Sequence, residues 1–389
     1  MLRSLLSAGY EVDIIVSNLS ERGISSKNIE ERLSKRYSGA NFIVRKHPSL
    51  LDKSLTGTKE YKLYKLYKLS LFLDVLTFSR YKVSNYKLLP YNIRNIIKSS
   101  LHSKHYDIVY CNYLYTFGNF MKKKKIEVVT DIHDYQYRRI ENDVIPSSSW
   151  IESKLYSLFF KKSELNTLKK IDKILSISPI ESKMIEKDIR HPNVYTAPAT
   201  ADDPNSIDAL KYTYDLSFIG SNSDANRDSI IWFLDNCFSK IVEKNSRVKL
   251  LIQGRIVRNK LVKENEILKK YIGRNIIVKD YVQDLSEVYI ATKIIIAPIV
   301  KGSGMKIKVI EALSYKKPVI GTDIAFEGIN VENRKNVIVA NKSIEFIDAV
   351  NLLINDKTLL KILKNNAYKL FKAEHSFNAS VALIKKVIK

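Results

Sequence analysis

The 389-residue sequence predicts an α/β protein of two domains, and three observations support this class. Short apolar runs of strand length alternate with helical patterns over the whole chain. The length suits two domains, each large enough to bury its own core. Hydrophobic residues make up 45% of the sequence, which excludes a wholly disordered chain.

Five apolar runs in the first half have strand length, with helical patterns between them. The clearest helix of this half is predicted over residues 150–170. Residues 194–213 contain two prolines and no clear apolar periodicity, so they are predicted to be the linker between the domains. The predicted strands are residues 12–17, 41–45, 108–111, 127–130 and 173–177.

The second half repeats this alternation and holds seven of the twelve glycines between residues 220 and 328. Because glycine lets the backbone approach a ligand closely, ligand binding is expected in this half. The chain closes with an amphipathic pattern over residues 377–389, which predicts a terminal helix. The predicted strands are residues 215–219, 248–253, 276–278, 294–298, 318–320 and 337–339.

The most informative stretch is residues 294–328, which reads as strand, glycine loop, helix, strand and glycine loop. Residues 294–298 are too short and too β-branched for a helix, so they are predicted to be a buried parallel strand. Gly302, Ser303 and Gly304 allow a tight turn whose backbone N–H groups can approach a ligand. An ordinary strand–helix–strand unit would use these glycines for its turns alone, so the residues after the loop decide between the two interpretations.

Lys306, Lys308 and Glu311 follow inside a helix predicted over residues 305–315. Lys308 and Glu311 are three residues apart and therefore share a helix face near its N-terminus. A cation, a carboxylate and backbone donors then lie at the positive end of the helix dipole, which suits a ligand that carries phosphate and hydroxyl groups. We interpret this cluster as a ligand site.

The pattern G-S-G-x-K-I-K-V-I-E-A-L-x(4)-P-V-I-x-T in this stretch resembles the donor-binding signature of the retaining glycosyltransferases of family four, which have the GT-B fold. Residues 215–222 and Asn226 resemble the opening strand, loop and helix of that family's nucleotide-sugar domain. Residues 250–254 resemble its second strand, and residues 278–285 resemble its base-proximal segment. The resemblance covers residues 212–340 in order and spacing.

The resemblance implies a GT-B fold, with two Rossmann-like domains facing a central cleft. Residues 1–197 would form the acceptor domain and residues 198–376 the nucleotide-sugar donor domain. The helix over residues 377–389 would return to brace the N-terminal domain. No cofactor is expected beyond the donor itself.

The resemblance also implies the donor site. Lys308 matches the family's diphosphate-binding lysine, and Lys306 matches its basic neighbour. Glu311 matches the second glutamate of a paired-glutamate motif, whereas the position of the first glutamate is Ser303 here, which puts sugar recognition by that carboxylate in doubt. The donor-binding residues expected are Gly220, Ser221, Gly302, Ser303, Gly304, Lys306, Lys308 and Glu311, and Lys308 and Glu311 are also expected to be catalytic.

A second cluster of polar side chains follows the strand predicted over residues 127–130. Asp131, His133 and Asp134 come at its carboxyl end, where open α/β sheets bind ligands. The family often carries a His-Asp pair at this loop, so the resemblance makes His133 a catalytic candidate close to the donor sugar. A purely structural histidine is the alternative.

The start of the chain departs from the family pattern. Residues 3–16 resemble the first helix and the second strand of the family's N-terminal domain. Because the preceding strand and its glycine loop are absent from the sequence, we expect an N-terminal domain that lacks its first strand and has an unpaired sheet edge. A truncated start and a protein without full activity are both open explanations.

The chain is strongly basic, with a formal net charge of +24. Residues 52–104 carry eleven Lys or Arg against three acidic residues, interleaved with tyrosine and leucine. This composition suits an anionic membrane surface, and a solvated helix face over a core-packing stripe is the alternative. Nucleic acid is not an expected partner, because the basic residues are spread along the chain and no binding motif is recognisable.

Several absences narrow the class of protein. No apolar run reaches the roughly 20 residues needed to cross a bilayer, and the N-terminus is too short and polar for a secretory signal. Cys111 and Cys237 are expected to be reduced core residues of a cytoplasmic protein. Because no two aspartates are spaced D-x-D and no Cys/His cluster is present, no metal is expected, and Lys308 and helix dipoles should stabilise the leaving group.

These observations predict a cytoplasmic, metal-independent hexosyltransferase, peripheral on the inner face of the membrane if the membrane interpretation holds. It would move a hexose from a nucleotide diphosphate-sugar donor to a hydroxyl of a glycan or lipid-linked acceptor, in surface polysaccharide or glycolipid synthesis. Retention of anomeric configuration is implied by the resemblance alone. The alternatives are another GT-B chemistry, such as a nucleotide-sugar epimerase, and a catalytically inactive GT-B-like protein that binds membranes or partners.

Overall fold

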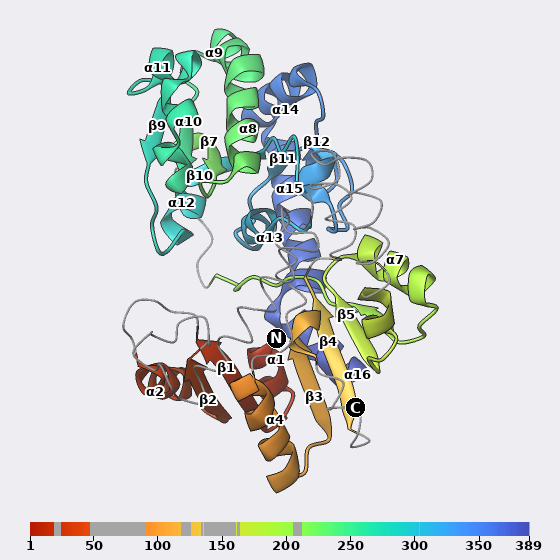
Figure 1. Ribbon diagram of the computed structural model, residues 1–389. Helices are drawn as coiled ribbons and strands as arrows, with labels where there is room; N and C mark the ends of the chain where they lie inside the picture. The colour runs from red at the N-terminus through yellow and green to blue at the C-terminus, as the bar shows by residue number, and fades with distance from the viewer. Residues whose placement is uncertain are drawn as a thin grey trace, which may run out of the picture. The chain divides into compact units, whose positions relative to one another are not determined.

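The computed structural model divides the chain into two compact units (Figure 1). The first unit is Met1–Thr196 together with Val381–Lys389, and the second is Ala197–Ser380. The structure describes residues 1–18, 25–46, 91–117, 126–133, 135, 161, 164–204, 212–302 and 304–388.

The first unit contains two parallel sheets, one of strands β1 and β2 and one in the order β3-β4-β5-β6. β4 and β5 are the most buried of these strands, and each has a residue of intermediate exposure only at its first position. The strands are β1 (Val12–Asn18), β2 (Ala40–Lys46), β3 (Ile108–Asn112), β4 (Glu127–Ile132), β5 (Lys173–Ser176) and β6 (Val194–Thr196). The helices are α1 (Leu2–Ser7), α2 (Ser26–Arg36), α4 (Tyr91–Ser103), η4 (Leu114–Thr116), α7 (Pro179–Ile189) and α16 (Phe377–Val387), which begins in the second unit.

β1 and β3 are not hydrogen-bonded to each other in the described residues. Side chains connect the two strands at their amino ends, where the Asp13 carboxylate accepts hydrogen bonds from Tyr106 Oη at 2.7 Å and Lys104 Nζ at 2.9 Å. The hydrogen bonds from Tyr106, from Asn41 Nδ2 at 2.8 Å and from Lys104, in this order of effect, lower the pKa of Asp13 to about 2. The apolar residues of β1 are only half-buried, although Val44 on its neighbour β2 is fully buried.

The second unit is built on one six-stranded parallel sheet in the order β12-β11-β10-β7-β8-β9. Its strands are β7 (Tyr214–Ile219), β8 (Leu250–Gln253), β9 (Ile276–Lys279), β10 (Thr292–Ala297), β11 (Val319–Gly321) and β12 (Ile338–Val339). Its helices are α8 (Asp224–Phe233), η7 (Leu234–Phe238), α9 (Ser239–Lys244), η8 (Arg255–Arg258), α10 (Lys260–Glu264), α11 (Glu266–Tyr271), α12 (Ser286–Ala291), α13 (Ile307–Ser314), η9 (Asp323–Phe326), α14 (Ser343–Asn355), α15 (Lys357–Leu370) and η10 (Phe371–His375).

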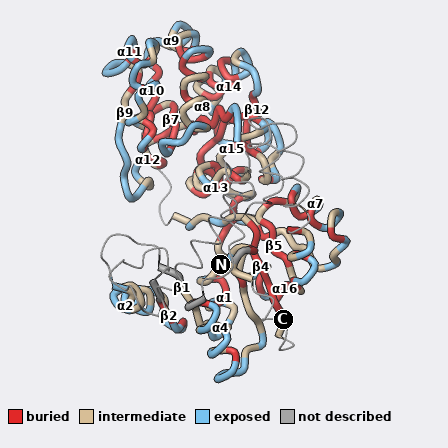
Figure 2. Tube along the Cα trace, viewed as in Figure 1, coloured by how far each residue is buried: buried red, intermediate tan, exposed pale blue. Residues whose placement is uncertain are grey.

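The central strands of this sheet are buried over nearly their whole length, as Figure 2 shows. Parallel sheets carry helices on both faces, so their strands read as continuous apolar runs. Leu216, Leu250 and Ile294 are fully buried on three adjacent strands and pack in the main apolar core with Phe233 and Phe346 from α8 and α14. This core holds the carboxyl ends of the strands in place, and those ends carry the candidate site.

The predicted fold class, α/β with parallel sheets in two domains, is confirmed. The predicted strands are all present, with bounds shifted by at most two residues at either end. The linker prediction is wrong for residues 194–196, which form β6 and pair with β5. A strand of three residues is too short to show a period, and its pairing depends on a neighbour 20 residues away in the chain.

Some expectations fall outside the described residues. Most of the helix predicted over residues 150–170 lies outside the described residues, and so do residues 52–90 of the basic segment. Residues 91–103 of that segment form α4. Among the described residues, no helix is both long and apolar enough to cross a membrane. Cys111 and Cys237 are both buried free thiols, and burial raises the pKa of each to about 12.

Candidate functional site

The candidate site of the second unit lies where β7 and β10 end, at the centre of the sheet (Figure 1). From β7 the chain passes to β8 and β9 on one side, and from β10 it passes to β11 and β12 on the other side. In open parallel sheets, ligands bind at the carboxyl ends of the two strands where the order reverses. The loop 220–223 after β7 and the loop 298–306 after β10 leave the sheet at this point.

Two glycines bring neighbouring loops into close contact here. Gly254 follows β8 with φ +109°, and a Cβ on it would lie 2.5 Å from the carbonyl oxygen of Gly220. The Gly220 amide donates to Gln253 O at 2.9 Å, and its carbonyl accepts from Ile256 N at 3.2 Å. Since a Cβ contact at 2.5 Å is sterically forbidden, glycine at 254 lets the loop after β7 keep its path.

The loop after β7 ends at the N-terminus of α8. Ser223 caps that helix by accepting a hydrogen bond from Asn226 N at 3.3 Å. The Asn226 side-chain amide donates to Ser221 O at 3.2 Å and to Ser221 Oγ at 3.1 Å. Asn226 therefore holds the Ser221 loop in a defined shape.

Lys308 reaches this loop from α13. Its Nζ donates to Asn226 Oδ1 at 2.7 Å and to Ile219 O at 3.2 Å, and it lies 4.7 Å from the centre of the Phe218 ring. Burial, and then repulsion from Lys306, lowers the pKa of Lys308 to about 8. The two hydrogen bonds go to neutral oxygen atoms, so the charge of this cation is not neutralised by a carboxylate in these contacts.

Glu311 lies one turn further along α13. Its Oε2 accepts a hydrogen bond from Tyr289 Oη at 2.9 Å, and Tyr289 is almost fully buried. Burial raises the pKa of Glu311, and the Tyr289 hydrogen bond counteracts part of that rise. The Tyr289 ring stacks on Tyr315, with ring centres 4.8 Å apart, so its hydroxyl is held in one position.

The glycine loop after β10 carries the remaining predicted residues. Gly302 is exposed and has φ +112°, and Gly304 also has a positive φ. Lys306 is the N-cap residue of α13, and its Nζ donates to Gly304 O. Ser303 lies outside the described residues.

This arrangement can bind an anion that has hydroxyl neighbours. Lys306 and Lys308 supply positive charge, the N-terminus of α13 supplies its dipole, and Glu311 supplies an acceptor. The structure thus brings together, around the ends of β7 and β10, those predicted donor-site residues that it describes: Gly220, Ser221, Gly302, Gly304, Lys306, Lys308 and Glu311.

His133 belongs to the first unit, at the carboxyl end of β4, and has its own cluster. Its Nε2 lies 3.2 Å from Asp131 Oδ2, and its ring centre lies 4.3 Å from that of Tyr113. Tyr113 follows β3, the neighbour of β4, and its backbone N–H donates to Asp131 Oδ1 at 2.8 Å. Asp134 lies outside the described residues.

Sequence reasoning missed the roles of Asn226, Tyr289 and Tyr113. Asn226 appeared only as part of a family pattern, and Tyr289 and Tyr113 carried no signal of their own. Each contacts a predicted residue that is distant along the chain, up to 82 residues for Asn226 and Lys308. A positive φ at Tyr113 is also invisible in the sequence, because tyrosine rarely adopts it.

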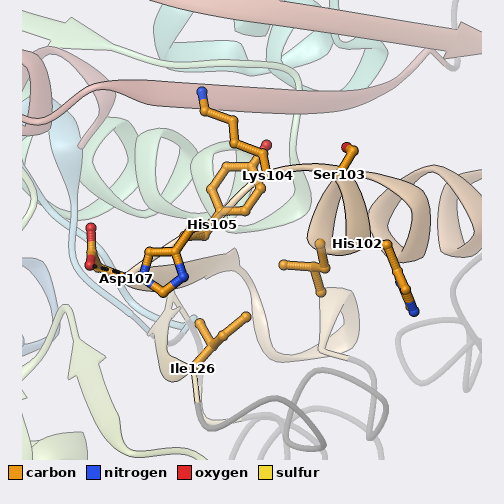
Figure 3. A pocket seen from close by; sticks show the side chains of 8 residues that line it. His102, Ser103, Lys104, His105, Asp107 and Ile126 are labelled. Carbon is orange, nitrogen blue, oxygen red and sulfur yellow. Dashed lines mark ion pairs between the residues drawn. The ribbon is translucent and has the colours of Figure 1, made fainter.

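A pocket of about 500 Å³ in the first unit is lined by residues 101–107 and Ile126 (Figure 3). It lies at the amino end of β3, the opposite end from Tyr113. His105 and Asp107 form an ion pair there at 3.7 Å, and both side chains are about nine-tenths exposed. None of the predicted site residues lines this pocket.

The described residues contain no group of three or more His, Cys, Asp or Glu side chains placed to hold a metal ion.

Comparison with known proteins finds a family match within the second unit. Residues 213–356 match the family model described as Glycosyl transferases group 1. This part of the chain resembles the glycosyl transferases of group 1. Its matched residues include the loop after β7, the loop after β10 and helix α13, so the geometry described above lies within the matched part of the chain.

A curated relative resembles nearly the whole chain. It is described as an "Uncharacterized 44.6 kDa protein in cps region" of Klebsiella pneumoniae. The two sequences are 24% identical over 362 residues, which is 89% of this chain and 82% of the relative.

Solved structures share the fold. Sucrose-phosphate synthase from Thermosynechococcus elongatus matches with a TM-score of 0.64 and 13% identity, over 99% of this chain and 90% of its own. HepE from Anabaena, in complex with UDP, matches with a TM-score of 0.62 and 12% identity, over 97% of this chain and 99% of the HepE chain. TarM matches with a TM-score of 0.55 and 19% identity. The match covers 72% of this chain but only 54% of the length of TarM. These likenesses confirm the GT-B fold.

Proposed function

We propose that the chain is a glycosyltransferase that moves a hexose from a nucleotide diphosphate-sugar to an acceptor hydroxyl. The observation that carries this proposal is Lys308, a partly buried cation whose hydrogen bonds go to the neutral oxygen atoms Asn226 Oδ1 and Ile219 O. It lies at the central switch point of the sheet, within the residues that match the glycosyl transferases of group 1. A cation in this position would neutralise the charge that develops on a leaving diphosphate.

The donor would bind with its diphosphate on residues 302–308 and on the loop that starts with Gly220 and Ser221. UDP is bound in the solved structure of HepE, and UDP is present in a complex of TarM. We therefore expect a bound nucleoside diphosphate to stabilise the second unit against thermal unfolding. In a panel of nucleotide-sugars, the true donor should raise the melting temperature of the protein. Addition of an acceptor should then release the nucleoside diphosphate. A panel without any thermal shift or release would contradict the proposal.

Glu311 would accept hydrogen bonds from the ribose of the donor. Replacing Glu311 with Gln keeps the shape and removes a charge-assisted hydrogen bond worth roughly 1.5–3 kcal/mol, so donor affinity should fall about 10- to 100-fold. Calorimetric titration with the nucleotide measures this change. The control is Glu287→Gln, an exposed position on α12. Equal affinity of the Glu311→Gln variant and the wild type would remove Glu311 from donor binding.

His133 would contact the donor sugar as a further catalytic side chain besides Lys308 and Glu311, and the transfer would proceed with retention. What supports His133 is its place at the carboxyl end of β4 and its partially exposed ring, 41% accessible beside a buried carboxylate. Retention rests on the resemblance to family four and is tested by the anomeric configuration of the product, read by NMR. An inverted product would exclude a retaining mechanism.

The reaction would need no metal ion, because Lys306, Lys308 and the α13 dipole supply the positive charge for the diphosphate. Turnover should therefore be unchanged, within about twofold, in excess EDTA. Donor turnover that is lost in EDTA and restored by manganese or magnesium would overturn this proposal. Nucleotide release with and without EDTA is the measurement, and a metal-dependent glycosyltransferase assayed alongside serves as the control.

The acceptor would be a glycan or a lipid-linked glycan in surface polysaccharide or glycolipid synthesis. The relative from Klebsiella pneumoniae lies in a cps region, which supports this class of pathway. The structure of a TarM variant contains alpha-GlcNAc-glycerol together with UDP, so a related fold accommodates a glycosylated polyol.

The basic segment over residues 52–104 would hold the protein at an anionic membrane surface. Its excess of eight positive charges should give reversible binding of about 1 kcal/mol per basic residue close to the surface, weakening with salt. Cosedimentation with anionic and neutral vesicles at low and high salt tests this. Changing Lys62, Lys65 and Lys68 to Gln should weaken binding to anionic vesicles.

The matched control for this segment changes three exposed lysines of the second unit, Lys260, Lys263 and Lys270, to Gln. Both triple variants lose the same net charge. Equal binding of the two variants, or equal binding to both vesicle types, would support the solvated helix face instead.

A further inference from the structure

The His133 cluster contains a buried carboxylate whose role has no assignment. Asp131 is 6% exposed and lies opposite Asn112 in the parallel register of β4 and β3. Its side chain faces hydrogen-bond donors from both strands. Tyr113 N donates to Oδ1 at 2.8 Å, and His133 Nε2 lies 3.2 Å from Oδ2.

Asn112 adds to this set. With its amide nitrogen directed at the carboxylate, it donates to Oδ1 at 3.0 Å and to Oδ2 at 3.1 Å. Asp131 is thus held in place by the end of β3, so its Oδ2 presents a fixed acceptor to His133.

The tautomer of His133 follows from this partner. A carboxylate can only accept hydrogen bonds, so Nε2 must carry the proton in the His133–Asp131 contact. In the neutral imidazole, Nδ1 then has a lone pair and can accept from a hydroxyl group. His133 is 41% exposed, and the face of its ring on one side is covered by Tyr113.

The backbone of Tyr113 is strained in a way that serves this contact. It has φ 67° and ψ 144°, a conformation that residues with a side chain rarely adopt. Hydrogen bonds on both sides hold it there: its N–H donates to Asp131, and its carbonyl accepts from Thr116 N at 3.0 Å and Thr116 Oγ1 at 2.8 Å. Strain that the surroundings maintain in this way is typical of functional sites.

We propose that Asp131 is a positioning residue that holds His133 as the Nε2–H tautomer, so that Nδ1 accepts a hydrogen bond from a hydroxyl of the substrate. Tyr113 and Asn112 hold the Asp131 carboxylate in place by hydrogen bonds. Tyr113 also covers one face of the His133 imidazole. This inference rests on the proposed transferase function for its effect on turnover, and on the contact between His133 and Asp131 alone for the tautomer.

Asp131→Asn is the sharpest test of the tautomer. The Asn oxygen would remain with Tyr113 N, and the amide nitrogen would then face His133 Nε2. Because that nitrogen is a donor, Nε2 has to become the acceptor and the proton moves to Nδ1. We expect ¹⁵N NMR of the neutral imidazole to report the Nε2–H form in the wild type and the Nδ1–H form in the variant. His133→Gln assigns the signal among the six histidines.

Turnover gives the second readout. The reversed tautomer presents a donor where the substrate hydroxyl needs an acceptor, so kcat should fall by about 10²-fold in Asp131→Asn. In the His133→Gln background, the same change should have no further effect. The matched control is Asp172→Asn at the other end of β4, where the Asp172 carboxylate accepts from Val128 N at 2.8 Å; it should change neither the tautomer nor kcat.

The outcomes separate this proposal from the proposed function. A wild-type chain that turns over no nucleotide-sugar contradicts the transferase, and the NMR signal still tests the Asp131–His133 pair. An Nδ1–H tautomer in the wild type overturns the positioning role, whether or not the Asp131→Asn variant folds. Turnover that stays at the wild-type level in a folded Asp131→Asn variant overturns it as well.

Discussion

Replacing Lys308 with alanine is expected to lower turnover by about 10²-fold or more, which corresponds to roughly 2.7 kcal/mol of transition-state stabilisation. The physical reason is that the charge on the diphosphate grows as the sugar leaves, while the Lys308 ammonium group lies fixed by Asn226 Oδ1 and Ile219 O. Single-turnover release of the nucleoside diphosphate measures the chemical step. The control is Lys260→Ala, because the Lys260 side chain is 86% exposed.

The pH dependence gives the same residue an independent signature. Burial lowers the pKa of Lys308 to about 8, and only the protonated form can neutralise a diphosphate. As the pH rises through about 8 the ammonium group loses its proton, so kcat/KM, which reports the free enzyme, should fall above that pH. A bound diphosphate raises the pKa of a nearby cation, so the decline in kcat should come at a higher pH. Undiminished turnover of a folded Lys308→Ala variant would remove Lys308 from the mechanism.

Replacing Gly254 with alanine is expected to destabilise the second unit by about 3 kcal/mol or more. The new Cβ would lie 2.5 Å from Gly220 O, a backbone atom that cannot move without shifting the loop after β7, and φ +109° is itself unfavourable for alanine. Because that loop is part of the proposed donor site, nucleotide affinity should fall as well. Denaturant unfolding and calorimetric titration measure the two effects.

Gly273→Ala is the matched control for this prediction. Gly273 also has a positive φ, +78°, but a Cβ there would meet no atom within 4 Å. Its cost should be limited to the backbone penalty of about 1–2 kcal/mol, with no change in nucleotide affinity. Equal destabilisation by the two substitutions would show that the contact between Gly254 and Gly220 has no consequence beyond backbone strain.

The strands and the glycine loop of the second unit could be predicted because each depends on the types of adjacent residues. Residues 294–298 form a short β-branched run, and the structure has β10 at Thr292–Ala297. Lys308 and Glu311 lie on one helix because they are three residues apart, and α13 carries both. A local rule needs no knowledge of the neighbours of a segment, so these features were accessible before the structure.

The short strand at residues 194–196 and the shape of the loop after β7 were not accessible in this way. Val194 pairs with Ile174, and Gly254 meets Gly220 across a distance of 34 residues in the chain. Both contacts depend on which strands lie next to each other in the sheet. A local pattern carries no information about that order.

The sequence by itself determined the fold class, the family resemblance, and the residue types that can bind a diphosphate and a ribose. Only the tertiary structure decided what surrounds them: Asn226 against Lys308, Tyr289 against Glu311, and Asp131 against His133. The physical reason is that the period of a helix, 3.6 residues, or of a strand, 2 residues, can be recognised from the types of neighbouring residues alone. The electrostatic state of a buried side chain is instead set by atoms that the sheet order brings within hydrogen-bond distance.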